Sequence, residues 1–401
     1  MGHDVVITGM GAVCTCGTGV EALWRDVVAG TSLATWSEPL ANGQRVPVYP
    51  APEAIVPSHL AEHARHMDRA AVYGLIAADE AAKQARLVDA IDPARLGVVM
   101  GTARGPVGVL GECLEREHAG KGQRPSRLSP GSVTAISGCV ASAFGALGAA
   151  FTVSAACASG AHAIAIGAGL IQSGAAEVVL AGGADAVLHP ALLSQFAAAG
   201  ILGRHEDPAL ACRPFDVTRN GTIFGEGAGV LVLESAASAS SRGARVLATL
   251  EGWALGSEPG ARTNVSDQGE ALQRVMRQGG AAACFGVDGG YVNAHGTGTL
   301  ANDAAEARAI LNVLGASVAV GSTKGVTGHC AGATPALEAI VCIQAMHEGI
   351  VPVSANCGEW DPDCAVRIVR ETAPWRGPKR AWSTSLGFWG VAACLQLGMG
   401  E

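Results

Sequence analysis

The sequence predicts an α/β fold of stacked layers made from two similar halves. Short apolar strands that end at glycine or another small residue recur along its 401 residues, and segments with helical periodicity separate them. Two segments, 158–173 and 330–347, are apolar on every side of the helix they would form, so they must be buried. Each follows a short strand and has a reactive side chain at its N-terminal end, Cys157 in one and His329 in the other. This repetition predicts a duplicated unit whose two copies meet at one active site.

Strands and one amphipathic helix divide the chain into these halves. The helix is expected over 70–84, where apolar residues recur at helical spacing. A strand at 230–234 is followed by the polar, small-residue segment 235–243, and we place the boundary near there. The N-terminal half then comprises residues 1–245 and the C-terminal half residues 246–401. The other strands are expected at 5–8, 96–101, 178–182, 291–294, 318–321 and 381–385.

Composition and charge exclude several classes of protein. The chain is 49% hydrophobic with 55 glycines, which is typical of a closely packed globular protein. Its net charge of −8 argues against a nucleic-acid partner, because phosphate binding requires a basic surface. Residues 128–176 carry no Asp, Glu, Lys or Arg, but Ser, Gly, Thr and His162 interrupt the run, so we expect a buried core and not a membrane span. No basic segment precedes the first strand, so we expect no signal peptide and a cytoplasmic protein.

The cysteines and histidines predict no metal site. Most of the twelve cysteines are scattered singly through apolar stretches, without a Cys-x-x-Cys pair, as expected for small buried residues in a reducing compartment. His59, His63 and His66 lack the carboxylate–histidine spacing of a metal site. Gly9-Met-Gly11 follows a strand, but Cys14 stands where a dinucleotide-binding turn needs a third glycine.

Cys157 is the candidate nucleophile. It lies in Ser154-Ala-Ala-Cys-Ala-Ser-Gly160, where a sharp turn between a strand and a buried helix would hold the sulfur at the helix N-terminus. A helix N-terminus lowers the pKa of a thiol, and its free N–H groups can bind a developing oxyanion. A lone cysteine is more often structural, and this motif favours a nucleophile without settling the choice.

His295 is a candidate functional residue, with a structural histidine held by a fixed partner as the alternative. It lies in Asn293-Ala-His-Gly-Thr-Gly-Thr299 at the carboxyl end of a strand, which is where α/β proteins place their ligand sites. Asp303 and Glu306 follow it and are candidates for the same network. A solvated helix face is a plausible alternative for Asp303 but a poor one for Glu338.

His329 is the second candidate histidine, and it ends the motif Ser322-Thr-Lys-Gly-Val-Thr-Gly-His329. Lys324 precedes it by five residues, and Glu338 follows nine residues later on the buried helix. A buried carboxylate is costly unless it is paired. Lys324 is the natural partner of Glu338 if the turn folds back.

Together these motifs resemble those of the elongating β-ketoacyl-acyl carrier protein synthases of fatty acid and type II polyketide pathways. The resemblance spans nearly the whole chain and preserves the order and spacing of the motifs. It implies the thiolase fold, a five-layer α/β/α/β/α arrangement of two similar halves, and a dimer. Further matching motifs are Val6-Ile-Thr-Gly-Met-Gly-Ala12, Arg213-Pro-Phe-Asp216, Gly225-Glu-Gly-Ala-Gly229 and Gly387-Phe388.

The resemblance implies a role for each candidate residue. Cys157 would accept an acyl group from a carrier-protein thioester. His295 and His329 would bind the thioester carbonyl of a malonyl-type extender and stabilise the enolate formed by decarboxylation. The backbone N–H groups of Cys157 and Phe388 would hold the oxyanion. Lys324, together with Glu338, would position and electrostatically support His329.

The resemblance also implies an acyl carrier protein as partner. Thr297 and Thr299 match positions that contact the pantetheine arm. This phosphopantetheine arm belongs to the carrier, so the enzyme itself needs no cofactor. The basic run that includes Arg65, His66 and Arg69 lies where relatives dock the acidic carrier, although an ordinary solvated helix would look the same.

The acyl pocket, assigned to Arg104, Phe196, Phe388 and Trp389, departs from the family pattern. The C-terminal loop of relatives usually reads Asn-Ser-Phe-Gly-Phe-Gly-Gly-x-Asn, whereas here it is Thr384-Ser-Leu-Gly-Phe-Trp-Gly-Val-Ala392, so Trp389 replaces a glycine. Arg104 stands where many relatives have an apolar residue. The bulk of Trp389 seeks burial, and an arginine is costly in an apolar tunnel. We therefore predict a pocket for short, rigid or polar acyl groups, unless Trp389 packs outward and Arg104 faces a dimer interface.

Two other kinds of protein share this resemblance. A non-catalytic, chain-length-setting subunit of a ketosynthase heterodimer is the main alternative, but such partners typically lack the nucleophile. A thiolase would need a second active-site cysteine in a Cys-x-Gly context, which Cys394 does not provide. The sequence thus favours a condensing acyltransferase, more in polyketide than in fatty acid biosynthesis, as a homodimer or a heterodimer.

Overall fold

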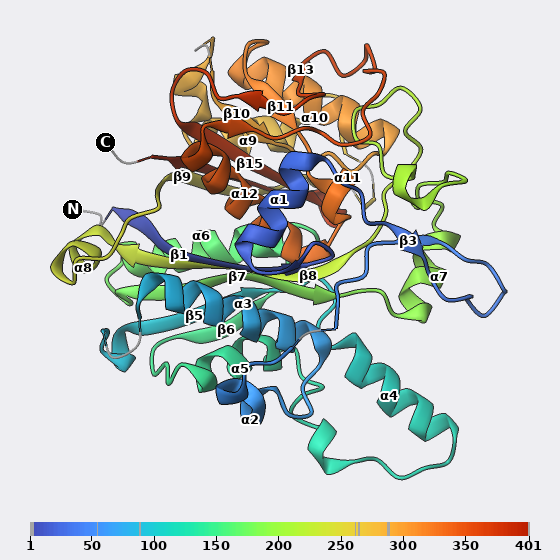
Figure 1. Ribbon diagram of the computed structural model, residues 1–401, viewed down its shortest axis with the longest axis vertical. Coiled ribbons are helices and arrows are strands. Elements are labelled where there is room, and N and C mark those ends of the chain that lie inside the picture. Colours follow the sequence, from blue (N-terminus) through green and yellow to red (C-terminus); the bar gives the residue numbers. More distant parts are fainter. Residues whose placement is uncertain are drawn as a thin grey trace.

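The computed structural model describes residues 4–53, 55–87, 90–260, 262–263, 265–286 and 289–399. These residues form five alternating layers of helices and β-sheet, seen edge-on in Figure 1. From the bottom of that view the helical layers are α3 (Arg69–Ala85) with α5 (Ala135–Ala143), then α6 (Ser159–Gln172) with α12 (Thr334–Glu348), then α9 (Glu270–Gln278) with α10 (Leu300–Leu314).

Each half of the chain contributes one sheet. The strand order is β6 (Ala150–Val153), β5 (Leu96–Gly101), β7 (Val178–Ala186), β8 (Glu226–Ser235), β1 (Val5–Cys14) in one, and β9 (Ala248–Ser257), β16 (Val391–Gly398), β15 (Arg380–Gly387), β10 (Tyr291–Asn293), β11 (Ala319–Gly321), β13 (Arg367–Ile368) in the other. The pairs Val6–Thr249 and Ile7–Ala248 join β1 to β9 and so link both sheets into one 12-stranded network. The predicted boundary at residue 245 falls just before this junction, and the division into domains stays a prediction.

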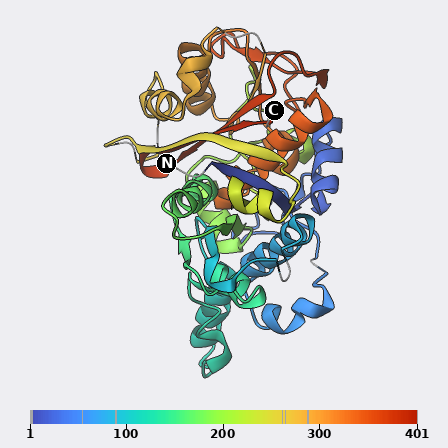
Figure 2. The ribbon, with the colours of Figure 1, turned by 90° about the vertical axis from the view of Figure 1, so that its left-hand side faces the viewer.

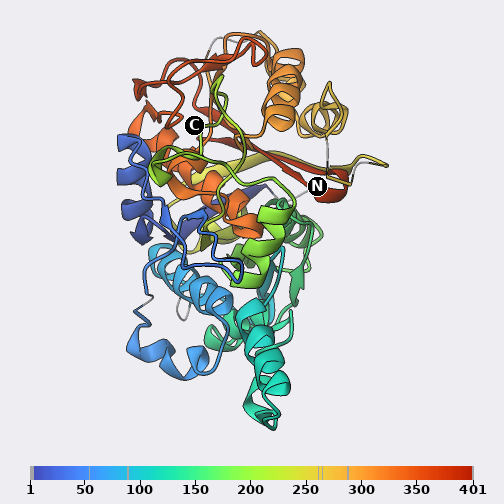
Figure 3. The same cartoon turned by 90° about the vertical axis from the view of Figure 1, so that its right-hand side faces the viewer.

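Shorter elements surround the layers. Figures 2 and 3 show α4 (Val107–His118) and the loop after it extending below the lower sheet, away from the other layers. The other short elements are β2 (Gly17–Thr18), α1 (Val20–Ala29), β3 (Thr35–Trp36), β4 (Pro47–Val48), α2 (Ala61–Ala64), α7 (Pro190–Ala198), α8 (Ala236–Ser241), α11 (Lys324–Thr327), β12 (Ile350–Val351) and β14 (Ala373–Pro374).

The two central helices form because both are apolar on nearly every side and both are sandwiched between the sheets. Helix α6 packs on β5 and β7, and α12 packs on both β8 and β15. Their N-terminal ends approach closely, since a Cβ on Gly160 would lie only 2.8 Å from the carbonyl oxygen of Gly332. Helix α12 begins four residues later than predicted, because a 3₁₀ turn over Ala331–Ala333 precedes it.

The predicted strands lie where the sequence places them, but several extend further than predicted. Strand β1 extends over Val5–Cys14 where 5–8 was expected, and all ten of its residues are buried. Gly9 and Gly11 look like strand ends in the sequence, yet they lie inside this strand. They are small because α3 packs directly on them: a Cβ on Gly11 would lie 1.9 Å from the carbonyl oxygen of Ala77. Strand β6 was expected only as the short strand before the Cys157 turn, without bounds, and strands β9 and β16 were not predicted.

The uncharged segment 128–176 forms α5, β6 and α6 within these layers. None of the helices in the described part of the chain is long and apolar enough to cross a bilayer.

Gly11→Ala tests the close packing of α3 on β1. The added methyl group would overlap the backbone of Ala77, so we expect a loss of about 2–3 kcal/mol or more in the free energy of unfolding. Gly138→Ala is the matched control, because it lies in α5 with no atom within 4 Å of the place where its Cβ would lie, and it should be neutral or stabilising by up to about 1 kcal/mol. Urea and thermal unfolding would measure both changes, and equal stabilities of the two variants would contradict the packing argument.

Candidate active site

Cys157 lies in the turn between β6 and α6, as the sequence predicts. Ala156 adopts a left-handed conformation with φ of 47°, which sharpens the turn. The Oγ of Ser159 accepts a hydrogen bond from the N–H of Ala155 at 2.9 Å and lies 3.1 Å from the carbonyl oxygen of Thr102. The turn is therefore fixed to the neighbouring strand, and Cys157 is half-buried with access to a cavity.

One cavity of about 720 Å³ lies between the two halves of the chain. It brings together Cys157, His295 and His329, which are far apart in the sequence. Lys324 and Glu338 lie behind the histidines and do not line it. The other predicted residues that line it are Arg104, Phe196, Thr297, Thr299, Phe388 and Trp389.

The turn that carries His295 is held by a buried carboxylate. The backbone N–H groups of His295 and Gly296 each donate to Glu306 at 2.7 Å, and the hydroxyl of Thr384 donates to it at 2.8 Å. Asp303 is fully buried and accepts a hydrogen bond from the N–H of Phe215, so a solvated helix face is the wrong interpretation for it. Both acids thus shape the backbone around His295.

The two histidine rings meet edge to face, with 5.3 Å between their centroids. The Nδ1 of His329 lies 3.1 Å from the hydroxyl of Thr334, and Phe224 stacks on its ring at 5.4 Å. Burial, together with the positive charge of Lys324, holds the pKa of both histidines well below the usual range. Both imidazoles are therefore neutral near pH 7 and act as hydrogen-bond donors or acceptors. Nothing in the sequence singles out Thr334 for this contact.

Lys324 and Glu338 form a buried ion pair, with 2.6 Å between Nζ and Oε1. Both side chains are 1% exposed or less, so the turn does fold back as the sequence suggested. Burial raises the pKa of Glu338 to about 7, although the charge of Lys324 opposes this shift. The hydrogen bond of His329 goes to Thr334, so Lys324 acts on the histidine ring through its charge.

Behind His295 lies a group of buried polar atoms that lack hydrogen-bond partners in the part of the chain that the structure describes. The side-chain amide of Asn293, Nδ1 of His295 and the hydroxyls of Ser383 and Ser385 have no hydrogen-bond partner among the described residues, and neither has Oε2 of Glu338. Asn293 and Ser383 are paired residues of β10 and β15. Polar groups of this kind cluster here at the adjoining ends of two strands.

The environment of Cys157 corrects one expectation. Although Cys157 opens onto the cavity, loss of hydration among the surrounding protein groups raises the pKa of its thiol to about 12. The charges of Lys324 and Arg104 oppose the shift, and Asp185 adds to it. The predicted lowering by the helix N-terminus is therefore outweighed, because loss of hydration penalises the thiolate more than these positive groups favour it.

Phe388 and Trp389 follow β15 and lie beside the Cys157 turn. A Cβ on Gly387 would lie 3.2 Å from the backbone nitrogen of Cys157, so the two turns are in contact. Trp389 has a left-handed φ of 67° and is 68% exposed, so the expectation of burial is wrong and the alternative that Trp389 packs outward is correct. Its backbone N–H donates to the carbonyl of Arg262 at 2.8 Å, and the Arg262 guanidinium lies 5.8 Å from the ring centroid. Trp389 forms part of the cavity rim.

The predicted docking residues lie outside the cavity, and they differ in whether their side chains are paired within the chain. Arg65 and His66 are exposed. Arg69 is engaged within the chain, where its guanidinium pairs with the buried Glu226 and with the hydroxyl of Tyr73. The Arg69 side chain is still 61% exposed, so all three residues are accessible to a partner.

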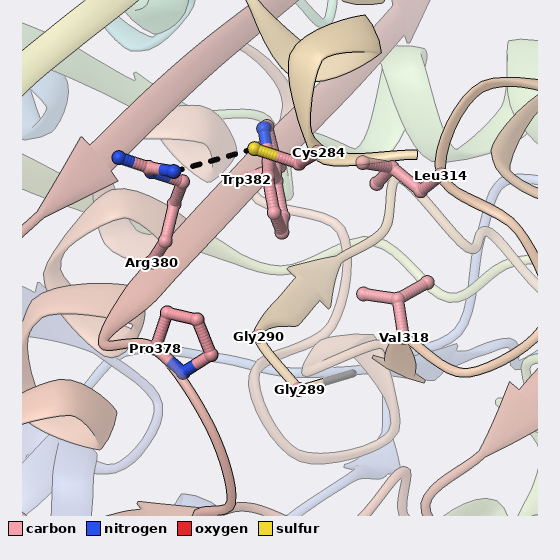
Figure 4. A pocket seen from close by; sticks show the side chains of 8 residues that line it. All are labelled: Cys284, Gly289, Gly290, Leu314, Val318, Pro378, Arg380 and Trp382. Carbon is pink, nitrogen blue, oxygen red and sulfur yellow. Dashed lines mark hydrogen bonds between the residues drawn. The ribbon is translucent and has the colours of Figure 1, made fainter. Parts of the chain in front are cut away.

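A second hollow, drawn in Figure 4, lies in the C-terminal half. Its volume of about 10 Å³ has room for about one water molecule. Arg380 donates to the sulfur of Cys284 at 3.3 Å there and pairs with Glu251 at 2.5 Å. None of the predicted site residues lines this hollow, which is too small for a substrate.

Alkylation of Cys157 tests the raised pKa of its thiol. Only the thiolate reacts, so the rate with iodoacetamide should rise about tenfold per pH unit from 7 to 9, without a plateau. Peptide mass spectrometry would follow the modified residue, with Cys157→Ser as the control for labelling elsewhere. A plateau below pH 8 would instead show a thiolate stabilised by the helix N-terminus.

Lys324→Met tests the buried ion pair. We expect a loss of about 3–5 kcal/mol at pH 8, because Glu338 is left buried without its partner. The pKa of Glu338 is raised from 4.5 to about 7 in the folded protein. Its ionisation therefore lowers the free energy of unfolding as the pH rises above about 4.5, and its contribution to stability is most favourable below that pH. Removing the cation raises that pKa further, so the defect of the variant should shrink at pH 5. Urea unfolding at pH 8 and pH 5 would measure the defect. Adding Glu338→Leu to Lys324→Met removes the unpaired carboxylate and should restore stability at pH 8, so a double variant no more stable than Lys324→Met would contradict the ion-pair argument.

Models of one protein family match both halves of the chain. The β-ketoacyl synthase N-terminal domain matches residues 2–239, and the β-ketoacyl synthase C-terminal domain matches residues 247–358. Nodulation protein E of Rhizobium sp. (strain N33) is 35% identical over 98% of this chain and 99% of its own length. The 3-oxoacyl-(acyl-carrier-protein) synthase 2 of Staphylococcus aureus (strain COL) is 33% identical over 98% of this chain and 97% of its own.

Solved structures agree with these matches. A type II polyketide synthase ketosynthase, in complex with its acyl-carrier protein and bound to a hexaketide, gives a TM-score of 0.90 at 27% identity and covers 100% of both chains. The ishigamide ketosynthase/chain length factor gives 0.88 at 31% identity with the same coverage. The predicted five-layer thiolase fold is therefore confirmed, and the chain belongs to the β-ketoacyl synthase family.

Proposed function

We propose that this chain is a catalytic β-ketoacyl synthase, which joins an acyl group held on Cys157 to a malonyl-type extender carried by an acyl carrier protein. The observation that carries this proposal is the cavity in which Cys157 meets two neutral histidines from the other half of the chain. A nucleophile beside neutral hydrogen-bond donors suits acyl transfer followed by stabilisation of an enolate.

The first step is a thiol exchange. The Cys157 sulfur attacks the carrier thioester, the carbon–sulfur bond to pantetheine breaks, and the Cys157 proton passes to the departing thiol. The backbone N–H groups of Cys157 and Phe388 face the tetrahedral oxyanion in this proposal, which agrees with the contact between their turns. The high pKa of Cys157 favours an exchange in which attack and proton transfer are coupled.

The second step forms the new carbon–carbon bond. The extender loses carbon dioxide, and its carbonyl oxygen becomes an enolate that His295 and His329 stabilise by hydrogen bonds. In this proposal the hydroxyl of Thr334, 3.1 Å from Nδ1 of His329, donates to that nitrogen, so the ring proton lies on Nε2 and can be donated to the enolate. The enolate carbon attacks the acyl carbon, the carbon–sulfur bond to Cys157 breaks, and the Cys157 sulfur takes up a proton from solvent. The product is a β-ketoacyl group on the carrier.

The remaining predicted residues position these groups. Lys324 and Glu338 set the electrostatic environment of the histidines from behind the cavity. Thr297 and Thr299, whose hydroxyls lie 2.9 Å apart on the cavity wall, contact the pantetheine arm. That arm arrives with the carrier, so the proposal includes no cofactor resident on the enzyme.

The partners follow from the same proposal. The acyl carrier protein docks near the exposed Arg65 and His66. A second ketosynthase-like chain completes a homodimer or heterodimer, a proposal supported by the chain length factor partner of one structural neighbour. The nucleophile favours the catalytic role over that of a chain-length-setting subunit. A polyketide pathway is favoured over fatty acid synthesis by the structural neighbours.

Acyl transfer and condensation can be tested separately. Carrier-bound acyl substrate should add one acyl group to Cys157 by intact mass and peptide mapping, and Cys157→Ala should abolish this. His295→Ala and His329→Ala should still load but should lower decarboxylation and condensation about 100- to 1,000-fold, because their hydrogen bonds form to charge that develops in that step. His59→Ala, outside the cavity, is the matched control. Acylation of a different cysteine, or condensation at the wild-type rate by either histidine variant, would refute the assignment.

A further inference from the structure

Arg104 occupies a fixed place in the wall of the cavity. It follows β5 in a loop whose backbone is bound to one buried carboxylate: the N–H groups of Ala103 and Arg104 donate to Asp185 at 2.8 and 3.1 Å. The hydroxyl of Thr102 donates to the same carboxylate at 2.7 Å. Ser159, two residues after Cys157, contacts the carbonyl of Thr102. The loop is therefore rigid and lies beside the nucleophile.

The guanidinium of Arg104 ends a column of stacked rings. Its central carbon lies 5.5 Å from the ring centroid of Phe196, which stacks on Phe224 at 3.9 Å, and Phe224 stacks on His329 at 5.4 Å. A guanidinium over an aromatic face is oriented by that face, while its edge N–H groups stay free to donate. The column thus aims a cation into the cavity from the same wall that carries the catalytic histidine.

Nothing in the described wall of this cavity neutralises that charge. No aspartate or glutamate lines it, and no carboxylate of the described residues forms an ion pair with Arg104. Asp185 binds only the backbone of this loop and is already satisfied by four donors from Thr102, Ala103, Arg104 and Gly332. Since the histidines are neutral, Arg104 is the permanent charge of the described lining.

An unpaired arginine has opposite effects on two kinds of acyl group. A plain alkyl chain laid against the guanidinium removes water from the charge and offers no hydrogen bond in return, which is costly. A carboxylate matches the planar fork of the guanidinium with two parallel hydrogen bonds. The wall therefore discriminates against alkyl chains and in favour of a terminal acid.

We propose that Arg104 selects acyl groups whose far end carries a carboxylate, so that the group loaded onto Cys157 is the half-thioester of a dicarboxylic acid. This inference rests on the proposed function and adds the substrate class to it. The Arg104 loop contacts the Cys157 turn through Ser159 and Thr102, so we infer that the far end of a short acyl group on Cys157 is the end that meets Arg104.

Loading of Cys157 with matched thioester pairs tests the proposal. Each pair has the same chain length, one member ending in a methyl group and the other in a carboxylate, with chains of about four to eight carbons and no extender present. Wild-type protein should load the carboxylated member about 10- to 100-fold more efficiently, the value of a hydrogen bond to a charged group. Arg104→Met should abolish or invert this preference, and Arg104→Lys, which keeps the charge but loses the fork, should retain part of it.

The controls separate this inference from the proposed function. Arg277→Met removes an exposed arginine of α9 outside the cavity and should leave the preference unchanged. Equal or better loading of the methyl-terminated member by wild type, or an unchanged preference in Arg104→Met, overturns the role of Arg104 while Cys157 acylation still supports the synthase. Failure of every thioester to acylate Cys157 overturns the proposed function and this inference together.

Discussion

The site depends on how closely two buried helices can approach each other between the sheets. The N-terminal ends of α6 and α12 are in contact through Gly160 and the backbone of Gly332, where no larger side chain fits. Cys157 precedes one helix and His329 precedes the other, so the distance between nucleophile and imidazole is set by this contact. Apolar sequence on every side of both helices makes the arrangement stable, because each helix is covered by sheet on two faces. The chemistry is thus located by packing between backbones and not by bonds between the reactive side chains.

Burial then determines the charge of each group at the site. Loss of hydration keeps His295 and His329 neutral, keeps Cys157 a thiol and raises the pKa of Glu338, all in the direction that avoids a buried charge. The positive charge of Lys324 lowers the pKa of all four groups. It therefore opposes the effect of burial on Cys157 and Glu338 and adds to the effect of burial on the two histidines. One buried cation therefore coordinates the protonation states of several groups without a direct bond to either imidazole. The exposed Arg104 differs from it, because solvent reaches its guanidinium in this chain.

The sequence was sufficient for what local patterns and a family resemblance encode. Apolar runs located the strands, and all-round apolar helices with a reactive residue at each N-terminus located the site. It was insufficient wherever the outcome depends on a distant neighbour. Asp185 and Thr334 carry no local signal, since their partners come from other segments. The pKa of Cys157 was misjudged because burial, unlike a helix terminus, is not visible in a short motif. Trp389 was expected inside, but a left-handed backbone turns it to the rim.

The place of β1 in the sheet has a consequence for synthesis on the ribosome. Val5 pairs with Ser235, and the other edge of the strand pairs with β9 from residue 248 onward. At about 5–20 residues per second, a delay of about 10–50 s separates the emergence of β1 from that of β8 and β9. For that time a strand of ten residues, every one buried in the finished molecule, has no sheet to join. A nascent chain of this kind is a natural client for chaperones that shield apolar segments until the first half of the molecule is complete.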